Sequence, residues 1–399
     1  MKFSDLNKPR REPARPEPVK KAPPRRAPVE EKPLPECAPR PRTGVSPRTE
    51  DRLEAIKCGD QAYKPRTRET RNAPREPAAP FRDLDVKARE VYSRVLNQAG
   101  ELLKHIDQPY TEKYEAILRT CALTADTLKT NSVLLNYLAF STAEDYLHAH
   151  TANTAILAIA LGLASDLEQP ELRLLGFCAM VHDIGMTGYD AIYRSEDRLT
   201  DEEFAEITLH TEAGMQKLDR IVDIDYRIKD RAKLIILQTH ERLDGSGYPD
   251  RIASEEIDPL AQLIGIADVY EAMTHPRAWR GPLNPPDAIK ELIDKEGRGF
   301  NSRAVKALIS ALSIYPPGSL VALSTGEIAK VIKVNKGSLT RPLLEVVLNA
   351  EFAQTTSHTI DLLEYPLTSI ERTVDFKELE QRNAKYAAKL DLARWWVQW

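Results

Sequence analysis

Apolar residues recur every three to four positions along most of residues 84–312, which is the spacing of amphipathic α-helices. The pattern is interrupted early, at Pro109, which predicts a break between two lead-in helices. Further along, Thr200 and Glu203 form the pattern of a capping box, a common way for a helix to begin. The chain is therefore predicted to be built mainly from α-helices.

The rhythm changes after the Pro-Pro-Gly break at residues 316–318. Short, β-branched runs bounded by turn residues follow, and they predict a small β appendage. The last stretch is a helical candidate that ends in Trp395, Trp396 and Trp399. These patterns divide the chain into a tail (1–82), a helical lead-in (83–135), a central helical domain (136–315), a β appendage (316–370) and a C-terminal helix (371–399).

Residues 1–82 hold more than half of the 28 prolines and few large apolar side chains. Such a segment buries too little surface to offset the entropy of ordering, so a disordered tail is predicted. The tail is basic, whereas the whole chain has a formal net charge of -4. A solvated linker is favoured over an anion-binding segment, and no nucleic-acid polymer is predicted as a partner.

Cysteine usage and hydropathy point to a cytoplasmic protein. Cys37, Cys58, Cys121 and Cys178 are scattered without short pairing, which is typical of reduced thiols. The longest apolar run, residues 155–164, is about half the length needed to cross a bilayer. The first residues lack the apolar region of a signal peptide, so no membrane span is predicted.

Histidines and aspartates recur about every 30 residues in the helical region, an interval that fits one helix plus one connection. Each can then project from its own helix toward a common centre. Imidazole and carboxylate groups suit divalent iron, manganese, zinc or nickel, and a carboxylate such as Asp183 can bridge two ions. Two ions supply an activated hydroxide for phosphoryl transfer. The residues are His150, His182, Asp183, His210, His240 and Asp268.

Successive motifs in this region resemble those of the HD-GYP branch of the HD phosphohydrolase superfamily. They include VHDIGM, LTDEEFAEITLHTEAG, HERLDGSGYP and IADVYEAMTHPRAWR, and the resemblance spans roughly residues 84–334. It implies an α-helical bundle with a two- or three-metal site that hydrolyses the bacterial second messenger cyclic di-GMP to pGpG or GMP. It also implies that the six residues above are metal ligands, with His182 and Asp183 at the catalytic centre.

The resemblance further implies a nucleotide-facing surface made by the GYP loop and the arginines of THPRAWR. Glycines let the backbone turn tightly, a tyrosine offers a stacking face or a hydroxyl donor, and guanidinium groups pair with phosphate. Surface ion pairs are the alternative interpretation of the arginines. The predicted substrate contacts are Gly245, Gly247, Tyr248, Pro249, Glu271, Arg277 and Arg280.

The sequence departs from the family pattern at two telling positions. Thr239 stands where the family usually has a metal-binding histidine, and Met186 stands where a lysine commonly holds the scissile phosphate. Tyr146 replaces a glutamate of three-metal members, which favours two ions. An active cyclic di-GMP phosphodiesterase is the first hypothesis.

Two alternatives stay open. The first is a weakened module that binds cyclic di-GMP or a signalling protein, the latter through the tail or the C-terminal helix. The second is a phosphohydrolase for another nucleotide, because Met186 changes the part of the pocket that meets phosphate. The helical lead-in also leaves a homodimer open.

Overall fold

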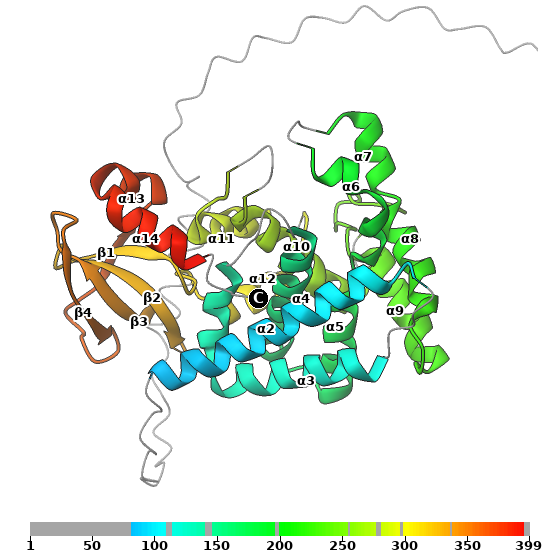
Figure 1. Cartoon of the computed structure of the whole chain (residues 1–399), viewed down its shortest axis with the longest axis horizontal. Coiled ribbons are helices and arrows are strands. Elements are labelled where there is room, and N and C mark those ends of the chain that lie inside the picture. The colour runs from blue at the N-terminus through cyan, green and yellow to red at the C-terminus, as the bar shows by residue number, and fades with distance from the viewer. Residues whose placement is uncertain are drawn as a thin grey trace, which may run out of the picture. The chain divides into compact units, whose positions relative to one another are not determined.

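The computed structural model describes residues 81–108, 114–139, 146–195, 199–253, 256–276, 281–295, 298–335 and 337–394. Within these ranges the predicted mainly α-helical body with a small C-terminal β-sheet is confirmed (Figure 1). Residues 1–80 of the predicted tail, Arg277, Arg280 and the three C-terminal tryptophans lie outside the described residues, and the last two residues of the predicted tail begin the first described helix.

The lead-in consists of two long helices and a short one. They are α2 (Phe81–His105), α3 (Tyr114–Thr130) and the 3₁₀ helix η1 (Ser132–Ala139), and α2 lies along α3 and α4 (Tyr146–Ala164) (Figure 1). Tyr92 of α2 is fully buried, and its hydroxyl donates a hydrogen bond of 3.0 Å to Asn153 Oδ1 on α4. The lead-in therefore packs directly on the helix that carries His150.

Helix α4 is the centre of the helical core. It contacts α5 (Gln169–Val181), α10 (Pro259–Thr274) and α12 (Ser302–Leu312). Among the described helices, only α4 is long and apolar enough to cross a membrane, and 83% of its apolar window is buried inside the protein. Its apolar surface is thus explained by burial among other helices, as expected for a helix that is hydrophobic on all sides.

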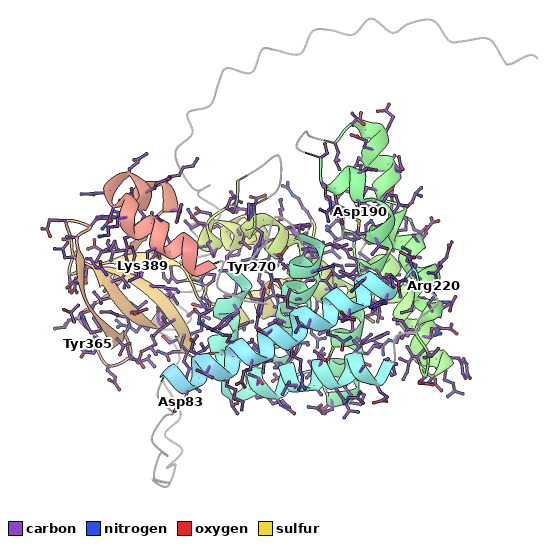
Figure 2. All side chains as sticks on the ribbon, in the orientation of Figure 1. Asp83, Asp190, Arg220, Tyr270, Tyr365 and Lys389 are labelled. Carbon is purple, nitrogen blue, oxygen red and sulfur yellow. The ribbon has the colours of Figure 1, made fainter. Side chains whose placement is uncertain are left out.

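The remaining helices surround this core. They are η2 (Ile184–Gly188), α6 (Asp190–Tyr193), α7 (Asp201–Ile207), α8 (His210–Lys217), η3 (Leu218–Arg220), α9 (Tyr226–Gln238) and α11 (Pro285–Asp294). In Figure 2, Asp190 and Arg220 label the beginning of α6 and the end of η3. The predicted capping box is present: Thr200 accepts from the Glu203 backbone, and the Glu203 carboxylate accepts from the Thr200 backbone.

Glycine permits a very close approach between η2 and α8. A Cβ on Gly185 would stand 1.9 Å from the His210 carbonyl oxygen and 2.7 Å from the Gly214 nitrogen. Both distances are shorter than any real contact, so only glycine fits between these two backbones. The segment after His182-Asp183 is therefore pressed against the helix that begins with His210.

The β appendage is a single antiparallel sheet. Its strands are β1 (Leu320–Leu323), β2 (Ile328–Asn335), β3 (Ser338–Leu348), β4 (Gln354–Asp361) and β5 (Ile370–Thr373), in the order β4-β3-β2-β1-β5. Alternate residues enter two separate apolar clusters: Val321 and Leu323 lie in one, and Ala322 in the other. This alternation is the period of two that a strand imposes.

The C-terminal segment differs from the single helix expected at residues 371–399. Residues 370–373 pair with β1, and the chain then forms α13 (Phe376–Arg382) and α14 (Ala384–Arg394). Asn383 separates the two helices because its φ of -150° and ψ of 76° are not helical. The sheet is fastened to the helical body by a hydrogen bond of 2.8 Å from Asn136 Nδ2 to the Ile332 carbonyl oxygen.

Candidate metal centre

The six predicted metal ligands come together from five separate parts of the chain. Each is at most 9% exposed, although all of them are polar. Buried polar groups of this kind require partners, and carboxylates and imidazoles that face each other in a core are typical of metal sites. His150 lies on α4, His182 and Asp183 directly follow α5, His210 begins α8, His240 follows α9, and Asp268 lies on α10.

Asp183 stands at the centre of this cluster. Its Oδ2 lies 3.4 Å from His150 Nε2, and its Oδ1 lies 3.5 Å from His182 Nε2. The same Oδ1 is 3.4 Å from His210 Nε2 and 3.7 Å from His240 Nε2. Two groups of three potential ligands result, His150-His182-Asp183 and Asp183-His210-His240, and Asp183 belongs to both. This arrangement suits a carboxylate that bridges two ions.

Asp268 on α10 adds a second carboxylate to the cluster. One carboxylate oxygen lies 3.2 Å from His150 Nε2, and the other lies 3.6 Å from His240 Nδ1. Asp268 thus faces one histidine of each group of three. Two carboxylates among four imidazoles give a donor set that divalent transition metals accept.

The hydrogen bonds around the cluster turn ligand atoms toward its centre, where His210 Nε2 also lies 3.0 Å from His240 Nε2. His182 Nδ1 donates to the Ala179 carbonyl at 2.9 Å, and His210 Nδ1 donates to the Ile207 carbonyl at 2.6 Å. A proton on Nδ1 leaves the lone pair of Nε2 facing the cluster. Within the described residues, His182 Nε2 and Asp183 Oδ1 are buried without a hydrogen-bond partner. The residues present therefore fit bound divalent metals.

Charge states in the metal-free cluster differ between its members. Burial disfavours the charged forms of His150 and His210, but the neighbouring groups, Asp183 among them, outweigh it and raise the pKa of both imidazoles, so metal binding must displace their protons. Burial opposes ionisation of Asp183, but the nearby histidines, His182 foremost, outweigh it and hold the pKa of Asp183 well below its usual value. Burial lowers the pKa of His240, which keeps this imidazole neutral. An ionised carboxylate and a neutral imidazole are the forms that coordinate a metal.

Glu271 lies behind His150 in the structure. Its carboxylate accepts a hydrogen bond from His150 Nδ1 and one of 3.2 Å from Asn153 Nδ2, and its backbone carbonyl accepts one of 2.8 Å from His275 Nδ1. It is only 3% exposed. We expected Glu271 among the substrate contacts, whereas its position supports orientation of the His150 ring, which commonly tunes a metal ligand.

Glu271→Gln is expected to lower manganese affinity about 10- to 100-fold, because the amide accepts a weaker hydrogen bond from His150 than a carboxylate does. Titration of metal-stripped protein with Mn²⁺ measures the change. Glu212→Gln, an exposed position on α8, is the matched control. Equal affinities for the Glu271 variant and the parent would contradict an orienting role.

The predicted nucleotide-facing loop is folded against the metal ligands. The Tyr248 ring stacks on the His240 ring with a centroid distance of 4.9 Å and an interplanar angle of 10°. A Cβ on Gly247 would stand 2.4 Å from the His240 carbonyl oxygen, so glycine is required there. Gly245 has a φ of +72°, a conformation that favours glycine, and the peptide bond before Pro249 is cis. The loop therefore brings Tyr248 beside the cluster.

Glu241 holds this loop in place. Its side chain is 3% exposed and accepts hydrogen bonds from the backbone nitrogens of Asp250 at 2.7 Å and Ile252 at 3.0 Å. A buried carboxylate that accepts hydrogen bonds from two backbone N–H groups holds the start of the loop, where Glu241 lies, to its end.

Glu241→Ala is expected to lower the free energy of unfolding by about 3 kcal/mol, since two charge-assisted hydrogen bonds are lost and two buried N–H groups remain. Urea denaturation of the metal-free protein measures this change without interference from bound ions. The exposed Glu256→Ala serves as the control. A loss of unfolding free energy no larger than that of the control would contradict the role of Glu241 in holding the loop.

The two departures from the family pattern occupy different surroundings. Thr239 is 1% exposed, and its hydroxyl donates to the Ile235 carbonyl at 3.0 Å, one turn back along α9. Met186 lies on η2, just after Asp183, and is 8% exposed. Position 239 is thus turned into its own helix, while His240 joins the cluster.

The family comparisons agree with this geometry. Residues 135–303 match the model of the HD domain, and residues 320–382 match that of a KOW domain associated with the HD domain. The chain is 31% identical to "Cyclic di-GMP phosphodiesterase PA4108" of Pseudomonas aeruginosa over 57% of this chain and 54% of that protein. It is 27% identical to "Cyclic di-GMP phosphodiesterase PdeB" of Borreliella burgdorferi, over 60% and 62%. It therefore spans little more than half the length of these relatives.

Two further proteins are similar to parts of this chain. "3'3'-cGAMP-specific phosphodiesterase 2" of Vibrio cholerae is 29% identical over 40% of this chain and 30% of its own length. Among solved structures, Bd1817, an HDG"Y"P protein from Bdellovibrio bacteriovorus, has a TM-score of 0.47 and 18% sequence identity, and the match covers 66% of this chain and 79% of that one.

Proposed function

We propose that this chain is an HD-domain protein of the HD-GYP type and a metal-dependent phosphodiesterase that hydrolyses cyclic di-GMP. The observation that carries the proposal is the pair of buried ligand groups that share Asp183. A bridged pair of divalent ions is suited to displacement at a phosphodiester, because it stabilises both the attacking and the leaving oxygen. Iron or manganese is the preferred metal, with zinc or nickel as alternatives.

The chain's own residues have distinct parts in this reaction. When bound, the ions supply Lewis acidity and neutralise phosphate charge. Asp183 and the four histidines fix the ions, and Glu271 and the Ala179 and Ile207 carbonyls hold three of the imidazole rings. We assign catalysis to His182 and Asp183 on this basis.

Tyr248 provides a hydrogen-bond donor at the rim of the proposed site. Burial raises the pKa of its hydroxyl, and the charges of Asp268 and Asp183 raise it further. The hydroxyl therefore keeps its proton at neutral pH and can donate to a phosphate oxygen of the substrate. Gly245, Gly247 and Pro249 shape this loop, and we keep Arg277 and Arg280 as proposed phosphate contacts.

The substrate assignment is supported by the relatives, since PA4108 and PdeB are named cyclic di-GMP phosphodiesterases. Relatives named for 3'3'-cGAMP are also cyclic dinucleotide phosphodiesterases, so this nucleotide is the main competitor. The inward-turned Thr239 and the uncharged Met186 favour a second candidate, a module that binds cyclic di-GMP with little turnover.

One experiment separates these functions. The purified protein is stripped with a chelator, reloaded anaerobically with Mn²⁺ or Fe²⁺, and assayed for ions per chain. Cyclic di-GMP, 3'3'-cGAMP and linear dinucleotides are then tested as substrates, with products separated by chromatography. Two ions per chain and metal-dependent release of pGpG or GMP support the phosphodiesterase. Tight binding of cyclic di-GMP without turnover would instead support the binding module.

A further inference from the structure

Helix α7 carries an exposed aromatic residue beside the proposed site. Phe204 is 52% exposed, and α7 itself has no buried residue. The Phe204 ring meets Tyr248 edge to face, with a centroid distance of 6.0 Å and an interplanar angle of 88°. Tyr248 in turn stacks on the ligand His240. A continuous path of aromatic rings thus leads from the metal cluster to the solvent.

The position of Phe204 is fixed by both ends of its short helix. At the start, the capping box of Thr200 and Glu203 closes the first turn. At the end, the Ile207 carbonyl accepts a hydrogen bond from the ligand His210, and Ile207 packs against the helical core. Phe204 therefore sits one turn before Ile207, the residue whose carbonyl is held by the proposed ligand His210.

An exposed aromatic ring so close to a phosphate-binding centre matches the chemistry of a nucleobase. Base stacking on an aromatic side chain uses the π-face that Phe204 leaves open to solvent. The first turn of α7 also presents Asp201 and Glu202, both exposed. Carboxylates accept hydrogen bonds from the N–H donors that guanine has on its pairing edge, so this rim favours guanine.

The described polar side chains near the cluster offer little positive charge to the phosphates of the substrate. Asp183, Asp268 and Glu271 make the cluster rich in negative charge, which repels phosphate until ions are bound. Met186 provides no cation, and Arg242 donates to the carbonyl oxygens of Thr239 and Glu241. Among the described residues closest to the cluster, Tyr248 is left to meet the phosphates beside the bound ions, and a contact with a base adds binding energy that no phosphate contact supplies.

We propose that Phe204 stacks on a guanine base of the substrate. The inference rests on the proposed phosphodiesterase function and names the residue that holds the base. Phe204 takes no part in bond cleavage and contributes to substrate affinity through its half-exposed ring.

The test compares a substrate with bases and one without. Phe204→Ala and Phe204→Tyr are assayed with cyclic di-GMP and with an abasic ribose phosphodiester, which has no aromatic ring. Phe204→Ala is expected to raise KM for cyclic di-GMP about tenfold, the size of one lost base stack, with kcat and hydrolysis of the abasic diester unchanged. Phe204→Tyr keeps the ring and is expected to restore KM. Leu209→Ala, at a residue 49% exposed between α7 and α8, is the control.

Equilibrium binding makes the inference testable apart from turnover. Cyclic di-GMP, GMP and ribose 5-phosphate are titrated into manganese-loaded parent and Phe204→Ala protein. Weaker binding of the two guanine nucleotides alone supports the base contact, even where hydrolysis is absent and the proposed function fails. Equal losses for ribose 5-phosphate, or equal losses on both diesters, would show a structural role and overturn the inference. An unchanged affinity for cyclic di-GMP would overturn it as well.

Discussion

Asp183→Asn is expected to abolish binding of both divalent ions and to reduce phosphodiester hydrolysis by about 1,000-fold or more. Asp183 is the one residue common to both ligand groups, so its loss weakens both sites together. An amide carries no negative charge and offers a single acceptor oxygen, so it cannot bridge two cations. Metal ions contribute several kcal/mol to such reactions, and each 1.36 kcal/mol corresponds to about a tenfold change in rate.

Metal analysis of the purified variant and steady-state kinetics with added Mn²⁺ measure these effects. Asp190→Asn makes the same chemical change at an exposed position on α6 and is the matched control. If Asp183→Asn retained two ions per chain, the bridging role would be wrong. If it lost the ions but kept its turnover, the metal-dependent mechanism would be wrong.

Substitutions at two consecutive residues are expected to have opposite outcomes. His240→Ala should leave one ion per chain and remove most turnover, because His240 belongs to the group Asp183-His210-His240. Thr239→Val should keep both ions, because the Thr239 hydroxyl is bonded to the Ile235 carbonyl of its own helix. The valine keeps the shape of threonine and costs about 1 kcal/mol of stability through the lost hydrogen bond.

Metal content per chain and the manganese concentration at half-maximal activity distinguish the two variants. His105→Ala removes a histidine of α2 that does not belong to the cluster, and it controls for the general loss of an imidazole. A lower ion content in Thr239→Val than in His240→Ala would reverse our assignment of the ligand. In that case the threonine hydroxyl, and not the neighbouring ring, would hold the second ion.

The sequence was sufficient to predict the helical body and the meeting of the ligands. Histidines and aspartates about one helix and one loop apart converge because neighbouring helices in a bundle run close together. All six predicted ligands are indeed buried in one cluster. The strand at residues 370–373 was not predicted, because its four residues form a strand only by pairing with β1.

Contacts between residues on different helices could not be predicted from the spacing of residues in the sequence. Asn153, Glu271 and His275 form one hydrogen-bonded group behind His150, although residues 153 and 271 are far apart in the chain. The i,i+3 spacing of His150 and Asn153 and the i,i+4 spacing of Glu271 and His275 indicate shared helix faces. Only the packing of α4 on α10 brings those faces together.

The orientation of Thr239 illustrates the same limit. The sequence shows that a customary histidine is replaced, yet it does not show which way that position points. At the end of α9 the backbone turns, so residue 239 still faces its own helix and residue 240 faces the cluster. Adjacent residues at a helix end thus differ in direction for reasons that lie in the backbone.

Gly185 fixes the distance between two parts of the candidate metal centre. Because the η2 backbone rests directly on the carbonyl of His210, the separation between Asp183 and His210 is set by main-chain contact. Side chains in the surrounding core can change size without moving these two ligands apart, since no side chain lies between them. Variation of the core should therefore alter the stability of this protein much more readily than the spacing of these two predicted metal ligands.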